Sequence, residues 1–126
     1  MTKVLVVDDE RNMRIFLDLL LREEGYEVLL ADDGCMGLEY YRQEHPDVIL
    51  LDLNMPVLDG IAVLKILRAT DLKQPVIVLT GDTNPEMERQ VRALGVSEFM
   101  IKGFSLKALT GVLDRTLKTL TTRTAT

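Results

Sequence analysis

The amino-acid sequence predicts an α/β fold, in which a parallel β-sheet is covered by helices on both faces. Five short apolar runs alternate with segments of helical spacing, so a strand followed by a helix occurs five times. Four of these runs are apolar throughout, as is typical of strands buried on both faces. The runs are residues 4–7, 28–31, 48–51 and 76–79, with a weaker one at 98–101. With 126 residues, the chain is expected to form one domain.

The first two helices have recognisable ends. After the first strand, apolar residues recur at the spacing i, i+3, i+4, i+7, which predicts a helix with one buried face. These residues are Met13, Phe16, Leu17 and Leu20, and Gly25 fits the C-terminal cap. After the second strand we expect Asp32 and Asp33 to open a helix over residues 34–44, which Pro46 ends.

The third and fourth helices follow the same pattern. A helix over residues 59–69 is expected to bury Ile61, Leu64 and Leu67. The fourth helix is expected to begin at Thr83 or Asn84 and to end at Gly95. Pro85 suits its first turn, and Thr83 and Glu86 have the spacing of a capping box.

The last strand and helix complete the fifth unit. Residues 98–101 alternate in polarity, which indicates an edge strand. The helix after it starts near Ser105 and is expected to bury Leu106, Leu109, Leu113, Leu117 and Leu120. Threonine is a poor helix former and is frequent near the C-terminus, so residues 121–126 are expected to form a polar tail, either the fraying end of the helix or the start of a linker.

Composition excludes several classes of function. The net charge is −5, so no basic excess exists for direct binding of nucleic acid. One Cys and one His exclude an intramolecular disulfide, a cysteine-rich zinc site and a multi-histidine metal site. The apolar runs are far shorter than the roughly 20 residues of a membrane span, and the acidic N-terminal stretch does not fit a signal peptide. We therefore expect a cytoplasmic protein that binds no membrane.

Polar side chains follow four of the five predicted strands. Asp8 and Asp9 follow the first strand, Asp52 the third, Thr80 the fourth and Lys102 the fifth. The carboxyl ends of parallel strands meet at one edge of the sheet, where ligands bind. Neighbouring carboxylates repel one another unless a cation intervenes, and such oxygen ligands suit Mg²⁺. Alone, Asp8, Asp9 and Thr80 would be read as helix caps and Lys102 as a solvated charge, but together they favour a site.

A carboxylate beside Mg²⁺ can accept a phosphoryl group and form an acyl phosphate. This transfer requires positioning and neutralisation of charge more than covalent help from the protein. The ammonium of Lys102 and the hydroxyl of Thr80 are suited to both tasks. Asp52 is the best candidate for the nucleophile, because it ends the central strand and faces the acidic pair.

Several motifs, in order along the chain, resemble a response-regulator receiver domain of two-component signalling, of the kind found in chemotaxis regulators. The resemblance covers about residues 3–120. Each motif alone is weakly specific, whereas the ordered set is very specific. The motifs are Val6-Val7-Asp8-Asp9-Glu10, residues 46–60 (PDVILLDLNMPVLDG), Leu79-Thr80-Gly81 and Lys102.

The resemblance implies a doubly wound (βα)₅ fold with strand order 2-1-3-4-5, which is flavodoxin-like. It implies a receiver domain over residues 1–120 that acts as a phosphorylation-activated switch and not as an enzyme. Asp52 would accept a phosphoryl group from the phosphohistidine of a sensor histidine kinase or phosphotransfer protein. The face of the fourth helix, fifth strand and fifth helix would then change, to control a fused output domain, a homodimer or another partner.

The resemblance also implies roles for the residues of the site. Asp9, Asp52 and the backbone carbonyl of Asn54 would hold Mg²⁺, for which Mn²⁺ can substitute, and Asp8 would act through water. Lys102 would pair with the phosphate and Thr80 would move to bond it. Phe99 occupies the aromatic switch position, and Asn54 and Asp82 would tune dephosphorylation.

Two residues depart from the common pattern of this family. Proline, often after a cis bond, usually follows the lysine, whereas Gly103 follows Lys102 here. A cis bond without proline costs about 2.5–4 kcal/mol, and glycine reaches positive φ freely, so we expect a trans bond. The switch residue Phe99 replaces the usual Tyr and has no hydroxyl to donate.

Two other functions fit this topology less well. A Mg²⁺-dependent phosphatase with an aspartyl nucleophile would usually require a cap domain, for which 126 residues leave no room. A flavin or nucleotide module would offer Ser, Thr or Gly to phosphate after the first strand, where Asp8-Asp9-Glu10 would repel it.

Overall fold

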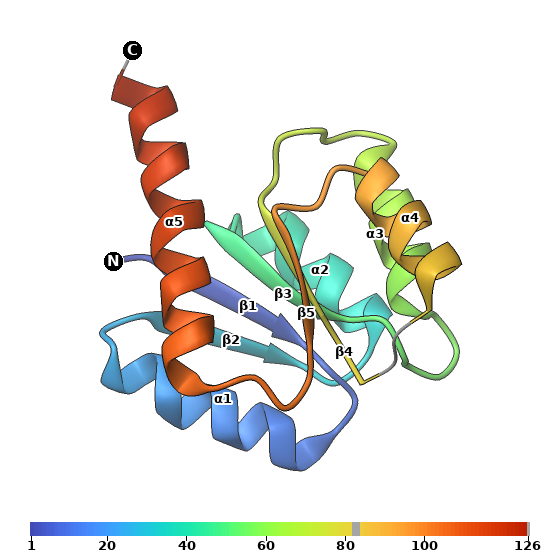
Figure 1. Ribbon diagram of the computed structural model, residues 1–126, viewed down its shortest axis with the longest axis horizontal. Helices are drawn as coiled ribbons and strands as arrows, with labels where there is room; N and C mark the ends of the chain where they lie inside the picture. Colours follow the sequence, from blue (N-terminus) through green and yellow to red (C-terminus); the bar gives the residue numbers. More distant parts are fainter. Residues whose placement is uncertain (82–83, 126) are drawn as a thin grey trace.

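The computed structural model describes residues 1–81 and 84–125, with side chains as far as residue 118. Within these residues, five strands and five helices alternate along the chain (Figure 1). The strands are β1 (Lys3–Val7), β2 (Glu27–Ala31), β3 (Val48–Asp52), β4 (Val76–Thr80) and β5 (Glu98–Ile101). The helices are α1 (Arg11–Glu23), α2 (Gly34–Glu44), α3 (Gly60–Arg68), α4 (Pro85–Ala93) and α5 (Leu106–Ala125).

The strands form one parallel sheet in the order β2-β1-β3-β4-β5, as predicted, with β3 at its centre. β5 lies at an edge, which confirms the prediction from its alternating polarity. Helices α1 and α5 cover one face of the sheet, and α2, α3 and α4 cover the other (Figure 1). Side chains from alternate strand positions enter two apolar clusters, one beneath each helical layer.

The buried face of three helices differs in part from the prediction. Phe16 is 48% exposed, and α1 instead buries Leu17, Leu20 and Leu21. The predicted apolar face contains Phe16, Leu17 and Leu20, whereas the face that packs on the sheet is shifted by one residue and contains Leu21 in place of Phe16. In α3, Val63 is buried with Leu64 and Leu67, whereas Ile61 is only partly buried. In α5, Leu106 is 43% exposed because burial begins one turn later, at Leu109.

The helix ends agree with the capping residues expected from the sequence where the structure describes them. Asp33 caps α2 by accepting a hydrogen bond from the Met36 N–H at 2.7 Å. Asn84 caps α4 by accepting from the Glu86 and Met87 N–H groups at 3.0 and 3.3 Å. The alternative cap, Thr83, lies outside the described residues.

The C-terminal residues agree with one of the two alternatives expected for them. Helix α5 continues to Ala125, so residues 121–125 extend the helix and the linker alternative is wrong for them. Extending a formed helix fixes one residue for each new hydrogen bond, whereas nucleation is costly. The low propensity of Thr therefore does not end this helix. The side chain of Leu120 lies outside the described part of the chain.

Candidate functional site

The polar residues expected at the carboxyl edge of the sheet are held there by the strand ladder. Asp52 and Thr80 are the last residues of β3 and β4. Asp8 continues the ladder beyond β1, because its N–H donates to the Ala31 carbonyl at 3.1 Å. The Lys102 N–H donates to the Thr80 carbonyl at 2.7 Å, which fixes the residue after β5 in the same way.

Three carboxylates gather at this edge. Oxygen atoms of Asp8, Asp9 and Asp52 lie within 4.8 Å of one another. Asp8 and Asp52 are each 2% exposed, whereas Asp9 lies at the surface. The cluster is therefore open to solvent on the Asp9 side and closed by protein beneath Asp8 and Asp52.

Lys102 supplies a positive charge to this cluster. Its Nζ lies 3.1 Å from Asp8 Oδ2, 3.5 Å from Asp52 Oδ1 and 3.8 Å from Glu10 Oε2. Burial lowers the pKa of Lys102, but the carboxylates of Asp52 and Asp8 outweigh this effect and raise it overall. The side chain is therefore a stable ammonium that faces both buried carboxylates.

Asp52 ionises less readily in this environment than a carboxyl group in water. Burial, followed by the charge of Asp8, raises its pKa to about 6. The Lys102 ammonium and the Asn54 N–H, which donates to Asp52 Oδ1 at 3.2 Å, act in the opposite direction. At neutral pH Asp52 is mostly ionised, and a further cation beside it would be stabilising.

Asp8 has two separate roles. Its Oδ1 accepts a hydrogen bond from the Glu10 N–H at 2.9 Å, which turns the chain into α1. Its Oδ2 is buried and pairs with the Lys102 ammonium at 3.1 Å. The interpretation of Asp8 as a helix cap is therefore wrong, because Glu10 is the N-cap of α1 and no side chain that the structure describes caps this helix, and the second oxygen of Asp8 belongs to the acidic cluster.

The acidic cluster fits a divalent cation of the Mg²⁺ type. Hard oxygen ligands lie close together, two of the three carboxylates are out of water, and the single ammonium of Lys102 does not balance three negative charges. A divalent ion held here would neutralise the carboxylates and the charge of an incoming phosphoryl group.

The loop after β3 is fixed by glycine at the start of α3. The Gly60 N–H donates to the Leu53 carbonyl at 3.0 Å, and a Cβ on Gly60 would collide with the Asp52 carbonyl oxygen. The Asp59 side chain caps α3 by accepting from the Ala62 N–H at 2.8 Å. Sequence reasoning included Gly60 in a motif without a role, and the close backbone approach supplies the reason for it.

The loop also contacts Thr80. Asn54 Nδ2 donates to Thr80 Oγ1 at 3.4 Å, which joins the residue two positions after Asp52 to the predicted switch hydroxyl. Thr80 is fully buried, whereas Asn54 is exposed. Sequence reasoning did not predict this contact, because strand order alone does not show how loop side chains point.

Of the remaining predicted residues, the structure describes Gly103 and Phe99. The Lys102–Gly103 bond is trans and Gly103 has a φ of +100°, which confirms the expected turn. Phe99 is 9% exposed, and the guanidinium of Arg92 lies over its ring, 5.8 Å from the centroid. Asp82 lies outside the described residues.

Replacing Asp9 by alanine is expected to weaken Mg²⁺ binding at least about tenfold without unfolding the domain. The charge of Asp9 raises the pKa of Asp52, so its removal relieves repulsion and the metal-free domain should melt at an equal or higher temperature. Titration with Mg²⁺ and thermal melting measure both effects, with Asp32→Ala as an exposed control. Unchanged metal affinity would show that Asp9 is not a ligand.

Comparison with known proteins places this site in a family. The family model for the response regulator receiver domain matches residues 4–114. The chain is 34% identical over 116 residues to the regulatory protein AtoC of Escherichia coli, covering 92% of this chain and 25% of that protein. It is 31% identical over 115 residues to sporulation initiation phosphotransferase F of Bacillus subtilis, covering 91% of this chain and 93% of that protein.

Solved structures agree with these matches. The chemotaxis protein CheY4 of Vibrio cholerae superposes with a TM-score of 0.87 at 35% identity, covering 93% of this chain and 99% of that one. The chain belongs to the response regulator receiver domain family. It spans a quarter of AtoC and 46% of the Mycobacterium transcriptional regulator PrrA, so such relatives contain other segments. In the part of the chain that the structure describes, no helix is long and apolar enough to span a membrane.

Proposed function

We propose that the chain is a phosphorylation-activated switch in which Asp52 accepts a phosphoryl group in a Mg²⁺-dependent reaction. The observation that carries this proposal is the pairing of a buried carboxylate with a fixed cation. Asp52 Oδ1 lies 3.5 Å from the Lys102 ammonium, inside a cluster of carboxylates that fits a divalent ion.

In the proposed reaction, a carboxylate oxygen of Asp52 attacks phosphorus and forms an acyl phosphate. The bond between phosphorus and the donor imidazole nitrogen breaks, and the leaving imidazole takes a proton from solvent. The Lys102 ammonium stabilises the charge on the phosphoryl oxygens, and the Thr80 hydroxyl bonds one of them. Asp9, Asp52 and the Asn54 carbonyl would hold Mg²⁺, with Asp8 acting through water. The chain itself is the phosphorylated product, so it is a switch and not an enzyme.

The donor is proposed to be a sensor histidine kinase or a phosphotransfer protein. Relatives named as a transcriptional regulator, a phosphotransferase and a sensor kinase support a place in such signalling. We propose that residues 1–120 form the receiver unit, that it acts in the cytoplasm, and that α4, β5 and α5 form the face that controls an output domain, a homodimer or another partner.

Intact-mass analysis tests the proposed chemistry. Wild type incubated with acetyl phosphate and Mg²⁺ should gain the mass of one phosphoryl group, and removal of Mg²⁺ by a chelator should prevent the gain. Asp52→Asn should gain none. Equal phosphorylation of wild type and Asp52→Asn would refute the assignment.

The proposed acyl phosphate is expected to be short-lived compared with those of other receiver domains. Its hydrolysis requires a water aligned opposite the leaving carboxylate, and Asn54 and Asp82 are short polar residues at the positions that line this approach in the family. The double variant Asn54→Leu, Asp82→Leu should retain its phosphoryl group longer, measured as loss of the phosphorylated mass with time. An unchanged decay rate would exclude these two side chains as determinants of lifetime.

A further inference from the structure

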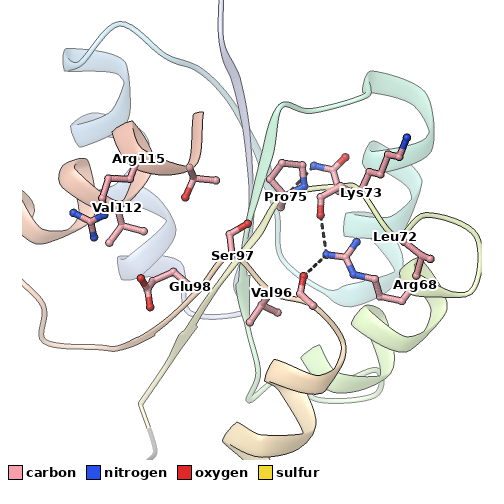
Figure 2. A pocket seen from close by; sticks show the side chains of 12 residues that line it. Arg68, Leu72, Lys73, Pro75, Val96, Ser97, Glu98, Val112 and Arg115 are labelled. Carbon is pink, nitrogen blue, oxygen red and sulfur yellow. Dashed lines mark hydrogen bonds between the residues drawn. The ribbon is translucent and has the colours of Figure 1, made fainter. Parts of the chain in front are cut away.

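A groove of about 410 Å³ lies at the opposite end of the sheet from the acidic cluster, and a buried arginine borders it (Figure 2). Pro75 and Ser97, which line the groove, directly precede β4 and β5. Arg68, the last residue of α3, is 8% exposed. A guanidinium buried to this extent requires hydrogen-bond partners, so its contacts are structurally important.

Arg68 joins two separate segments through their backbone carbonyls. Its Nη1 donates to the Asp71 carbonyl at 2.9 Å and its Nη2 to the Gln74 carbonyl at 2.8 Å, both in the loop between α3 and β4. Its Nε donates to the Leu94 carbonyl at 2.8 Å and its Nη2 to the Gly95 carbonyl at 3.0 Å. Leu94 is the C-cap of α4 and Gly95 follows it, so these hydrogen bonds attach the C-terminal end of α4 to this loop (Figure 2).

The loop between α3 and β4 is stabilised by hydrogen bonds of Asp71. Asp71 Oδ1 accepts hydrogen bonds from the Lys73 and Gln74 N–H groups at 2.9 and 3.0 Å. Asp71 Oδ2 accepts from the Tyr41 hydroxyl at 2.6 Å, which joins the loop to α2. The loop therefore belongs to the same rigid frame as α2 and α3.

The two ends of α4 are attached differently. Val91, in the C-terminal half, is fully buried, and Arg92 covers the Phe99 ring of β5. In the N-terminal half, Pro85 and Glu86 are exposed and Met87 is partly buried. This half follows β4, whose last residue is Thr80. The N-terminal end of α4 is therefore closer in sequence to Thr80 of the site than the C-terminal end is, and its side chains are less buried.

We propose that Arg68 makes the C-terminal end of α4 a fixed pivot, so that the switch surface changes by movement of the N-terminal end of the helix. This inference rests on the proposed function. Helix α3 begins at Gly60, against the backbone of Asp52, and ends at Arg68. Helix α3 therefore connects the loop after Asp52, at its start, to the pivot at Arg68, at its end. Because the C-terminal end of α4 is held there, a displacement of Thr80 relative to that loop would rotate α4 about this end. Arg68 is a positioning residue of the switch.

Two backbone amides report on the two ends of α4. The Glu88 N–H donates to the Asn84 carbonyl at 2.9 Å, and the Gly95 N–H donates to the Arg92 carbonyl at 3.0 Å. Hydrogen exchange at both, measured by NMR with and without BeF₃⁻ and Mg²⁺ as a phosphoryl mimic, tests the proposal. In wild type we expect the mimic to change exchange at Glu88 at least about threefold and to leave Gly95 unchanged.

Arg68→Lys keeps the positive charge but loses the planar set of donors. Without the mimic, the Gly95 amide of this variant should exchange about tenfold faster than in wild type. The reason is that the hydrogen bonds from the guanidinium to the Leu94 and Gly95 carbonyls, which hold this turn, are lost. In this variant, addition of the mimic should change the exchange rate of the Gly95 amide as well as that of the Glu88 amide. Arg89→Lys, the same exchange at an exposed position of α4, should behave as wild type.

The outcomes separate the pivot from the proposed function. A wild type in which the mimic changes Gly95 as strongly as Glu88 overturns the pivot and leaves the phosphoacceptor assignment intact, and this measurement does not depend on the folding of any variant. A mimic that fails to bind wild type, or binds Asp52→Asn equally well, overturns the proposed function and the pivot with it. Unaltered Gly95 exchange in folded Arg68→Lys overturns the role of Arg68.

Discussion

Replacing Lys102 by glutamine is expected to slow phosphorylation of Asp52 about 100-fold, the usual effect of removing one charge-stabilising group from a reaction site. Two effects act together. The phosphoryl oxygens lose a cation. The pKa of Asp52 also rises above about 6, because the charge of Lys102 no longer opposes the effect of burial. More of Asp52 is then protonated at neutral pH and unable to attack. Rates with acetyl phosphate and Mg²⁺, followed by intact mass, measure the loss.

The same substitution is expected to destabilise the domain by about 3 kcal/mol at pH 7, because two buried carboxylates lose their cation. Lys102 lies within 3.1 Å of Asp8 and 3.5 Å of Asp52. Lys107→Gln, at an exposed position of α5, is the matched control and should change neither property. A Lys102→Gln protein that is phosphorylated at the wild-type rate would remove Lys102 from the proposed chemistry.

Replacing Asp52 by asparagine is expected to stabilise the metal-free domain at neutral pH by about 2–3 kcal/mol. Burial and the charge of Asp8 raise the pKa of Asp52 from 3.8 to about 6, and each unit corresponds to about 1.4 kcal/mol. Because the folded-state pKa is raised, the wild type has this stability in full below about pH 3.8 and loses it as pH rises from there to about 6. Asparagine keeps an acceptor for the Asn54 N–H but carries no charge.

Chemical denaturation of both proteins between pH 3.5 and 7.5, in the presence of a chelator, measures this effect. The two should be nearly equal in stability at pH 3.5, and the advantage of Asp52→Asn should grow mainly between about pH 4 and pH 6 and then level off towards pH 7.5. Asp114→Asn, at an exposed position of α5, should show no such trend. A difference that stays constant or shrinks with rising pH would contradict the burial of an unfavourable charge at Asp52.

The fold was predictable because its strands are short, apolar throughout and separated by helices. The runs at residues 48–51 and 76–79 can only be buried on both faces, and a sheet covered by helices follows. The buried face of α1 was less predictable. Phe16 and Leu17 are adjacent and similarly apolar, so periodicity alone did not decide which faces the sheet, and Leu21 was missed.

The residues of the site were predictable from one rule, that parallel strands end at a common edge. Asp8, Asp52 and Thr80 follow from it directly, because the ladder fixes their places. Contacts made by loops and long side chains did not follow. Arg68 gives no signal in the sequence beyond a charge near the end of a helix, and its four carbonyl partners come from segments that only the folded chain brings together.

Chemical trapping of the phosphoryl group tests the central claim most directly. Borohydride reduces an acyl phosphate to an alcohol, which converts a phosphorylated aspartate into homoserine. Wild type treated with acetyl phosphate and Mg²⁺, reduced and mapped by peptide mass spectrometry, should contain homoserine at position 52 and at no other carboxylate of the cluster. Homoserine at Asp8 or Asp9, with Asp52 unmodified, would contradict the assignment of Asp52 as the phosphoacceptor.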